Sequence, residues 1–365
     1  MSYLRGIDLN LNIGSAWLVF LASLVAFTAC GGAGQNAPGM PAPVTLRVGY
    51  FPNITHATAL IGLSRGIFQE ALGPDVKIEQ KVFNAGPPVI EALFAGAIDI
   101  SYIGPGPAVT GYVRSDGEAV RIVAGAASGG AFFVVRKDSG IHSAKDLAGK
   151  KIATPQIGNT QDIALRSYLL HNGLKPTEVG GSVQVTPVNN PDILTLFQKK
   201  EIDGAWAPEP WATRLVREAD GRIFIDERDL WPQGRFATTV VIVRTKFLQE
   251  NPELVKRFLI GHVKSTEWTN GHQEESQTIF NQELTRIQTQ GLPLEVVQQA
   301  WSSLEFSTDI LEQSITGPAQ QAFELGFLGT KPLNLKNLID SKPLQDALQA
   351  SKSLGTTAGD QGGTR

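Results

Sequence analysis

The chain has 365 residues, of which 42% are hydrophobic and 18% are charged, and its formal net charge is -3. This length allows two α/β lobes with a core each, and this composition excludes bulk disorder. No block of lysine and arginine stands out, so the chain lacks the basic surface that nucleic-acid binding requires.

The first thirty residues have the pattern of a secretory signal that ends at a lipid-modified cysteine. An apolar stretch, Ile13–Ala29, follows Arg5 and ends at the only cysteine of the sequence, Cys30. The segment Phe27-Thr28-Ala29-Cys30 is typical of a lipobox, with Phe in place of the usual Leu. We therefore expect a lipoprotein signal peptide over residues 1–30 and a lipid on Cys30. The alternatives are an uncleaved membrane anchor and a plain signal peptide with a chance cysteine.

Flexible segments are expected on both sides of the folded part. Residues 31–43 contain four Gly and three Pro, which is the composition of a tether. Residues 355–365 are rich in Gly and Thr and are expected to form a flexible tail. A single cysteine also excludes an intrachain disulfide and a thiolate metal cluster.

Strand-like and helix-like segments alternate from residue 44 onward. The elements expected in this part are a strand at 44–50, a helix at 55–68, a strand at 76–82, a helix at 88–94, a strand at 98–103 and a helix through 109 and 113. Strands separated by helices of this length form right-handed crossovers, which predict a mainly parallel sheet.

The same order of elements recurs about a hundred residues later. The elements expected there are a strand at 151–154, a helix at 160–171, a strand at 183–187, a helix at 192–199 and a strand at 202–206. Residues 97–107 (Ala-Ile-Asp-Ile-Ser-Tyr-Ile-Gly-Pro-Gly-Pro) and 201–210 (Glu-Ile-Asp-Gly-Ala-Trp-Ala-Pro-Glu-Pro) also resemble each other. In both, Ile-Asp opens a buried strand and Pro-x-Pro begins the next helix, where proline is tolerated. The recurrence predicts two equivalent lobes.

Two β-rich runs, 131–136 and 237–244, are expected to connect the lobes, with a hinge near Arg136 and Arg244. The remaining helices, expected to pack on the first lobe, are at 252–270, 274–288, 293–302 and 309–327. The predicted fold is α/β, with two lobes, mainly parallel sheets and two crossover strands. Lobe I comprises residues 44–135 and 245–354, and lobe II comprises residues 136–244.

Four strand-to-helix turns combine small or polar residues with glycine or proline. These turns are at residues 52–56, 104–107, 156–161 and 208–211. In parallel α/β sheets, ligands bind beyond the carboxyl ends of the strands. Each turn presents a helix N-terminus, with free N–H groups and a partial positive charge. The pattern predicts an anion site in a cleft between the lobes that needs no lysine or arginine.

The individual side chains of these turns allow more than one role. Thr55, Asn159 and Thr160 fit as helix caps or as hydroxyl and amide donors. His56 either packs on its own helix or contacts the ligand. Glu209 either pairs with a distant arginine on the surface, contacts a ligand amine or hydroxyl, or closes the lobes. The glycines at 104 and 106 either permit the turn or approach the ligand. Trp211 either lies in the core or contacts the ligand, whereas Trp206 is expected in the core.

The four turns together resemble the nitrate/sulfonate/taurine family of ABC-transporter substrate-binding proteins. The motifs that carry the resemblance are Val-Gly-Tyr-Phe-Pro-Asn-Ile-Thr-His-Ala, Tyr-Ile-Gly-Pro-Gly-Pro-Ala, Thr-Pro-Gln-Ile-Gly-Asn-Thr-Gln-Asp and Trp-Ala-Pro-Glu-Pro-Trp. They lie within roughly residues 44–277. The resemblance implies the type II periplasmic binding fold, ABC permease subunits as partners, and a monomer held at the outer face of a membrane by its lipid.

The resemblance also implies the ligand class and the residues that contact it. The ligand is expected to be a small anion, most simply an aliphatic sulfonate or a taurine-like compound. The Glu-Pro-Trp turn also resembles the nitrate and bicarbonate branch, which leaves the ligand open. The residues carried over as ligand contacts, with a further candidate at the hinge (Ser128), are Asn53, Thr55, His56, Gly104, Pro105, Gly106, Ser128, Gln156, Gly158, Asn159, Thr160, Glu209 and Trp211.

Enzymatic readings of the sequence find little support. A His-Glu-x-x-His pair and a P-loop are absent, and Gly104 and Gly106 lack the third glycine of a dinucleotide fingerprint. A Gly-x-Ser-x-Gly string at 62–66 falls late in a predicted helix, not at a strand-to-helix turn. We therefore expect no catalytic residue, cofactor or metal. The rivals are a pyrimidine-binding or pyrimidine-synthesising protein on the same fold, whose synthases use a Cys-rich segment, and a sensor domain, which needs a signalling module.

Overall fold

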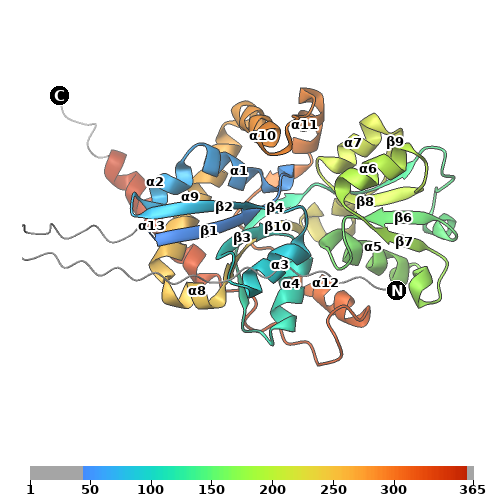
Figure 1. The fold of residues 1–365 in the computed structure, drawn as a ribbon, viewed down its shortest axis with the longest axis horizontal. Helices are drawn as coiled ribbons and strands as arrows, with labels where there is room; N and C mark the ends of the chain where they lie inside the picture. Colours follow the sequence, from blue (N-terminus) through green and yellow to red (C-terminus); the bar gives the residue numbers. More distant parts are fainter. Residues whose placement is uncertain (1–43, 360–365) are drawn as a thin grey trace, which may run out of the picture. The chain divides into compact units, whose positions relative to one another are not determined.

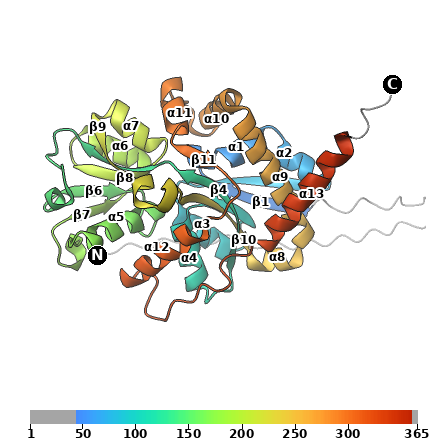
Figure 2. The same ribbon diagram turned by 180° about the vertical axis from the view of Figure 1, so that it is seen from behind.

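The structure is a computed structural model that describes residues 44–359, with the side chains of residues 44–353. These residues all belong to one compact unit, Ala42–Arg365, whose ribbon is drawn in Figures 1 and 2. The expected signal peptide, the lipidated Cys30 and the tether lie outside the described residues. Within 44–359, none of the helices combines the length and the apolar character that a membrane span requires.

Two sheets define the two lobes. The strands of the lobe I sheet are β1 (Val44–Tyr50), β2 (Val76–Val82), β3 (Ile100–Ile103), β4 (Val120–Gly129), β10 (Ala237–Arg244) and β11 (Leu304–Phe306). The strands of the lobe II sheet are β5 (Ala131–Arg136), β6 (Lys151–Thr154), β7 (Gln184–Pro187), β8 (Gly204–Pro208) and β9 (Gly221–Asp226). The orders are β11-β4-β10-β3-β1-β2 and β7-β6-β8-β5-β9. Apart from β11, the two orders match strand for strand, as the recurrence in the sequence predicts.

The sheets are mixed, which corrects the expectation of mainly parallel sheets. In lobe I, β1 pairs in parallel with β2 and β3, whereas β10 is antiparallel to both of its neighbours. In lobe II, β6 pairs in parallel with β7 and β8, whereas β5 is antiparallel to both of its neighbours. The antiparallel strands β5 and β10 are the ones by which the chain enters a sheet from the other lobe, so no βαβ crossover sets their direction.

The chain passes between the sheets earlier than the sequence suggested. The first passage is at Gly129 and Gly130, whose φ angles of 78° and 65° favour glycine. The second is the segment between β9 and β10, with two 3₁₀ helices, η4 (Glu227–Leu230) and η5 (Pro232–Gly234). All of β5 lies in the lobe II sheet and all of β10 lies in the lobe I sheet. The boundaries between the sheets therefore precede β5 and β10, whereas the sequence placed them at 135/136 and 244/245.

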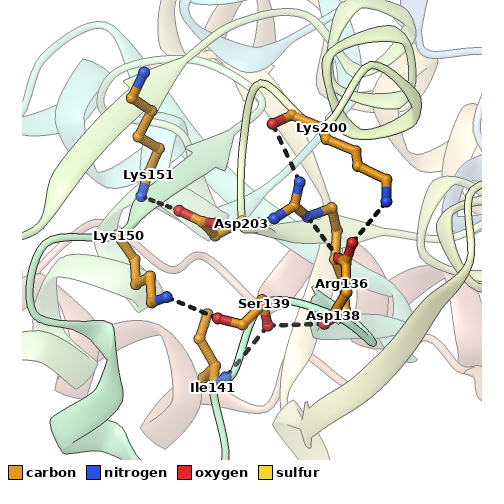
Figure 3. A network of polar contacts seen from close by, with 8 residues as sticks. All are labelled: Arg136, Asp138, Ser139, Ile141, Lys150, Lys151, Lys200 and Asp203. Atoms are coloured by element: carbon orange, nitrogen blue, oxygen red, sulfur yellow. Dashed lines mark hydrogen bonds and ion pairs between the residues drawn. The ribbon is translucent and has the colours of Figure 1, made fainter.

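Arg136 and Arg244 therefore lie at the far ends of β5 and β10, away from the passages, and not at a hinge. Figure 3 shows Arg136 tied to the Lys200–Asp203 turn: its guanidinium donates to the Lys200 carbonyl (3.1 Å) and to Asp203 Oδ1 (3.2 Å). Asp203 Oδ2 also accepts the Lys151 backbone N–H at 2.9 Å. The cluster fastens the ends of three neighbouring strands inside lobe II.

Helices cover both faces of the lobe I sheet (Figure 1). They are α1 (Ala57–Ser64), α2 (Ile67–Leu72), α3 (Gly86–Phe94), α4 (Pro105–Arg114), α8 (Thr245–Glu250), α9 (Pro252–Gly271), α10 (Gln273–Gln288), α11 (Leu294–Trp301), α12 (Glu312–Glu324) and α13 (Lys342–Gly359). One core joins the sheet to α1, α2 and α9, with Leu60, Phe68 and Phe258. The other core joins it to α3, α4 and α12, with Ile90 and Val109.

Lobe II repeats this three-layer arrangement with fewer helices. They are α5 (Thr160–His171), α6 (Asn190–Gln198) and α7 (Trp211–Glu218), with the short 3₁₀ helices η2 (Ala144–Leu147) and η3 (Thr177–Val179). Because side chains alternate along a strand, Phe132 faces the α6 and α7 core and Phe133 faces the α5 core. Trp206 is fully buried in the α5 core, as the sequence analysis expected.

Two expected segments differ in the structure. The helix predicted at 55–68 is divided into a 3₁₀ turn, η1 (Ile54–His56), then α1 and α2, because Gly66 takes a left-handed conformation with φ 72°. The flexible tail was predicted to begin at residue 355, whereas in the structure α13 continues to Gly359. Residues 360–365 lie outside the described residues.

Candidate ligand-binding cleft between the lobes

A small cavity of about 20 Å³ lies where the predicted turns of the two lobes meet. This volume holds about one water molecule. Six of the predicted contact residues line it: Asn53, Thr55, His56, Gly104, Asn159 and Thr160. Pro208, the first residue of the fourth turn, lines it as well. All four turns therefore reach one space, the small cavity, and lobe I and lobe II each supply two of them.

His56 is a neutral side chain of the cavity wall. It is 2% exposed and stacks on Phe51, with ring centroids 4.3 Å apart. Burial lowers the pKa of His56 to about 3. Its Nδ1 accepts the Phe51 backbone N–H at 3.3 Å, so the proton of the neutral ring is on Nε2. His56 can thus donate one hydrogen bond without bringing a charge.

Asn159 and Thr160 occupy the start of α5 on the lobe II side. Asn159 is the N-cap of α5, and its Oδ1 accepts the Thr160 N–H at 2.9 Å. The turn before them is held from inside the lobe, because Asp162 accepts the Gly158 N–H (2.9 Å) and the Thr154 hydroxyl (2.9 Å). Gly158 has φ 71°, which this turn requires. The sequence therefore builds a rigid helix N-terminus at the cavity.

Two hydrogen bonds join the lobes at the edges of the small cavity. Trp211 Nε1 in lobe II donates to Asn53 Oδ1 in lobe I at 3.1 Å. The Gly106 backbone N–H in lobe I donates to Thr160 Oγ1 in lobe II at 3.2 Å. Both contacts use residues that the sequence analysis placed at the cleft, and both hold the lobes together directly.

Glu209 does not line the small cavity. It is 2% exposed, and its carboxylate accepts the Thr213 N–H at 3.0 Å and the Thr213 hydroxyl at 2.7 Å. Burial raises the pKa of Glu209 to about 7, against the opposing effect of these two bonds. The carboxylate caps the first turn of α7, which positions Trp211 for its contact with Asn53.

Six further predicted residues also lie outside the small cavity, and two of them, Gly106 and Trp211, form the bonds between the lobes. Ser128 Oγ accepts the Phe236 N–H at 3.2 Å, beside the second passage between the lobes. Gln156 and Gly158 belong to the turn before α5 but do not reach the space. Pro105, like Gly106, lines a neighbouring larger cavity. These residues shape the turns and passages around the cleft.

Six further residues of the cavity wall were not predicted as contacts from the sequence. They are Phe51, Asn84, Gln161, Asn190, Pro208 and Thr238. Gln161 and Pro208 belong to turns that it did identify. Asn84 and Asn190 follow the second strand of each lobe, where the same strand-to-helix rule would have found them. Thr238 gives no such signal, because it lies in β10, which enters the lobe I sheet from the other lobe.

The electrostatics of the small cavity come from neutral groups. None of its twelve lining residues is an Asp, Glu, Lys or Arg, and its histidine is neutral. The helices α4, α5 and α6 begin at its wall, each adding partial positive charge. Asn190 is 5% exposed, and its buried Oδ1 has no hydrogen-bond partner among the described residues. Such an arrangement favours a small anion, or a ligand with both donors and acceptors.

Metal chemistry finds no ready site in this region. Among the residues that the structure describes, no group of three His, Cys, Asp or Glu side chains is placed to hold a metal ion.

The two matching sheets and the cleft between them define the class of protein, a two-lobed periplasmic-binding-protein fold. Solved structures share it. The alkanesulfonate-binding protein SsuA from Xanthomonas axonopodis pv. citri, bound to MOPS, superposes with a TM-score of 0.67 at 19% identity, covering 82% of this chain and 99% of SsuA. The nitrate-binding protein NrtA from Synechocystis PCC 6803 gives 0.67 at 16% identity, covering 85% and 89%.

The chain belongs to the NMT1-like family, which it matches over residues 39–282. A relative with a named ligand is the taurine-binding periplasmic protein of Escherichia coli (strain K12), which is 30% identical over 181 residues. That alignment covers 50% of this chain and 54% of the relative, so the chain spans about half the length of that protein.

Proposed function

We propose that this chain is the extracytoplasmic solute-binding component of an ABC importer and that it binds a small anion, an aliphatic sulfonate or taurine, between its lobes. The observation that carries the proposal is the small cavity, where both lobes contribute neutral donors and helix N-termini. SsuA and the taurine-binding protein, which bind such compounds according to their names, support it.

The anion is held by hydrogen bonds from both lobes. Lobe I offers the Thr55 hydroxyl and His56 Nε2, and lobe II offers the Asn159 and Thr160 side chains at the positive N-terminus of α5. Hydrogen bonds to an anion are stronger than bonds between neutral groups. A ligand that engages both sets at once binds the closed arrangement better than the open one.

The small volume of the cavity fits lobes that move about the two passages. The contacts Trp211–Asn53 and Gly106–Thr160 have to part for a sulfonate to enter, since about 20 Å³ admits only a water-sized group. Gly129 and Gly130 absorb the change in backbone angles, as hinge residues do. A permease then distinguishes the loaded protein by its closed shape.

A nitrate-type anion is the second candidate. NrtA shares the fold with the same TM-score as SsuA, and the cavity has little room for an organic substituent. The two candidates differ in one measurable respect, because only a sulfonate brings a tail that must be accommodated beside the anionic group.

Calorimetric titration of the full chain with taurine, methanesulfonate, nitrate and bicarbonate tests the proposal, with choline as a cationic control. A true ligand at about 100 times its Kd adds about 2.7 kcal/mol to the free energy of unfolding, which a thermal melt detects. Thr55→Ala and Asn159→Ala are expected to weaken binding by about 1–3 kcal/mol each. Thr278→Ala, on the exposed side of α10, serves as the control. Binding that survives both cleft variants contradicts a shared site.

The lipid anchor is a separate part of the proposal. The apolar stretch before Cys30 and the Gly/Pro-rich segment after it support lipidation and a place at the outer face of a membrane. We expect the anchored protein to act as a monomer. Cys30→Ser is expected to release the protein from the membrane fraction or to stall its processing. A processed Cys30→Ser protein that stays with the membranes contradicts the anchor.

A further inference from the structure

A second and larger cavity, of about 380 Å³, lies beside the small one and is also walled by both lobes. Lobe I contributes α4 and α12, and lobe II contributes α5 and the segment between β9 and β10. Thr160 lines both cavities, and its Oγ1 accepts the N–H of Gly106, which lines the larger one. The volume falls within the range of about 300–1,000 Å³ that small-molecule sites occupy.

The large cavity has one acidic group and no basic one among its lining residues, apart from His171. Glu227 is 4% exposed, and its Oε2 accepts the Trp206 indole N–H at 2.7 Å. It forms no ion pair with any described residue, whereas the neighbouring Asp226 is paired with Arg228 at 2.6 Å. A buried carboxylate without a cationic partner is unfavourable. Burial accordingly raises the pKa of Glu227 to about 7, although the indoles of Trp206 and Trp231 oppose the shift.

His171 does not compensate this carboxylate. Its Nδ1 lies 2.8 Å from the Ser167 carbonyl oxygen, at the C-terminal end of α5. The ring is therefore engaged with its own helix.

Aromatic side chains form much of the remaining wall. The rings of Tyr168 and Trp206 meet at 62° with centroids 5.9 Å apart. Those of Trp231 and Phe236 stack at 17° with centroids 6.1 Å apart. Aromatic faces attract both apolar rings and cations, and the attraction is stronger away from water. The walls thus suit an apolar body, and the carboxylate suits a positively charged group on it.

We propose that the large cavity is a second binding site, distinct from the anion site, for an organic amine with an apolar or aromatic body. The ammonium group pairs with Glu227, and the body packs between the half-buried rings of Tyr168 and Trp231. An anion is disfavoured here by the same carboxylate that an amine satisfies. The site takes residues from both lobes, so its occupant affects how the lobes fit together.

Titration of the full chain with three compounds that share one body tests the inference. 2-Phenylethylamine carries the cation, 2-phenylethanol is neutral, and 3-phenylpropanoate is the anion. We expect the amine to bind most tightly. Glu227→Gln keeps the shape and an acceptor for Trp206, and it is expected to lower amine affinity by about 10- to 100-fold. The alcohol is expected to change by less than about threefold, since it loses no charge interaction. Glu201→Gln, at an exposed glutamate of lobe II, is the matched control.

Ala164→Leu offers an independent test, because Ala164 lines the cavity from α5 and a larger side chain there reduces the volume while the Glu227 carboxylate is kept. It is expected to weaken the amine and the alcohol alike. The inference is overturned if the amine does not bind at millimolar concentration, if Glu227→Gln leaves its affinity unchanged, or if 3-phenylpropanoate binds more tightly. Taurine is titrated into the same variants. Failure of taurine to bind any of them contradicts the proposed function and leaves the amine result standing.

Discussion

Both lobes fasten the end of a strand with an aspartate that follows an isoleucine. In lobe I, Asp99 accepts the Arg47 backbone N–H at 3.0 Å and pairs with Arg244 at 2.9 Å. In lobe II, Asp203 accepts the Lys151 backbone N–H at 2.9 Å and pairs with Arg136 at 3.2 Å. The two arginines close β10 and β5, which hold equivalent places in the two sheets.

The two aspartates differ in burial and in the number of their partners. The Asp99 side chain is 0% exposed and bonds Arg47 as well as Arg244, whereas the Asp203 side chain is 22% exposed and has one arginine. Water compensates a lost ion pair only where it can reach the remaining group. The same motif therefore carries more of the stability in lobe I than in lobe II.

The lobes also differ in the kind of titratable group they bury. Lobe I buries His56 and His262, and burial lowers their pKa values to about 3 and about 4. Lobe II buries Glu209 at α7 and, in the passage beside it, Glu227, and burial raises the pKa of each to about 7. These groups of lobe I therefore lower the stability of the protein as the pH becomes acid, whereas those of lobe II lower it as the pH rises from acid toward neutral.

Asp99→Ala is the change with the largest expected effect. It leaves two arginines and a backbone N–H without their acceptor, and we expect the free energy of unfolding to fall by about 3–5 kcal/mol. Asp203→Ala is the matched change in lobe II and is expected to cost about 1–2 kcal/mol, because water reaches this site. Urea unfolding of both variants measures the difference. Equal losses in the free energy of unfolding would show that the difference in burial between Asp99 and Asp203 does not affect their contributions.

His56→Gln tests the acid sensitivity of lobe I. The folded-state pKa of His56 is lower than the unfolded value, so its contribution to stability is present above pH of about 6.5 and is lost as the pH falls toward 3. Glutamine keeps an acceptor for the Phe51 N–H and does not titrate. We expect the variant to lose about 2–4 kcal/mol less than the wild type over this range. Urea unfolding at a series of pH values measures this, with the exposed His142→Gln as the control.

Glu209→Gln makes the opposite test in lobe II. The folded-state pKa of Glu209 is higher than the unfolded value, so its contribution is present below pH of about 4.5 and is lost as the pH rises through 7. Glutamine still accepts the Thr213 N–H, and we expect the variant to lose about 2–3 kcal/mol less between these limits. The same unfolding series reports it. An unchanged pH slope would mean that Glu209 stays ionised in the folded protein.

Trp211→Phe is the change with the smallest expected effect, and it tests the contact between the lobes. It removes the bond to Asn53 but keeps an aromatic ring at the same place in lobe II. We expect a loss of about 0.5–1.5 kcal/mol in ligand affinity and a larger radius of gyration without ligand. Small-angle scattering with and without ligand measures the change. A variant that stays as compact as the wild type would assign lobe closure to other contacts.

Local patterns in the sequence determined the elements and much of the cleft. The limits predicted for β1, β2, β5, β6, β10 and α5 match the structure, because period and turn residues are local properties. The strand-to-helix rule brought six predicted residues to one cavity. The resemblance also indicated the two-lobed fold, which the solved structures share.

Tertiary structure alone decided which sheet each connecting strand joins and which polar side chains line the small cavity. The runs at 131–136 and 237–244 look alike in sequence, yet each lies wholly in one sheet, because pairing depends on neighbours far along the chain. Glu209 turns back to Thr213, and Thr238 enters the cavity from a strand without any turn signal. Glu227 lies in the larger cavity only because α12 of lobe I closes over α5 of lobe II. Contacts between segments more than a hundred residues apart are set by packing, which no local pattern encodes.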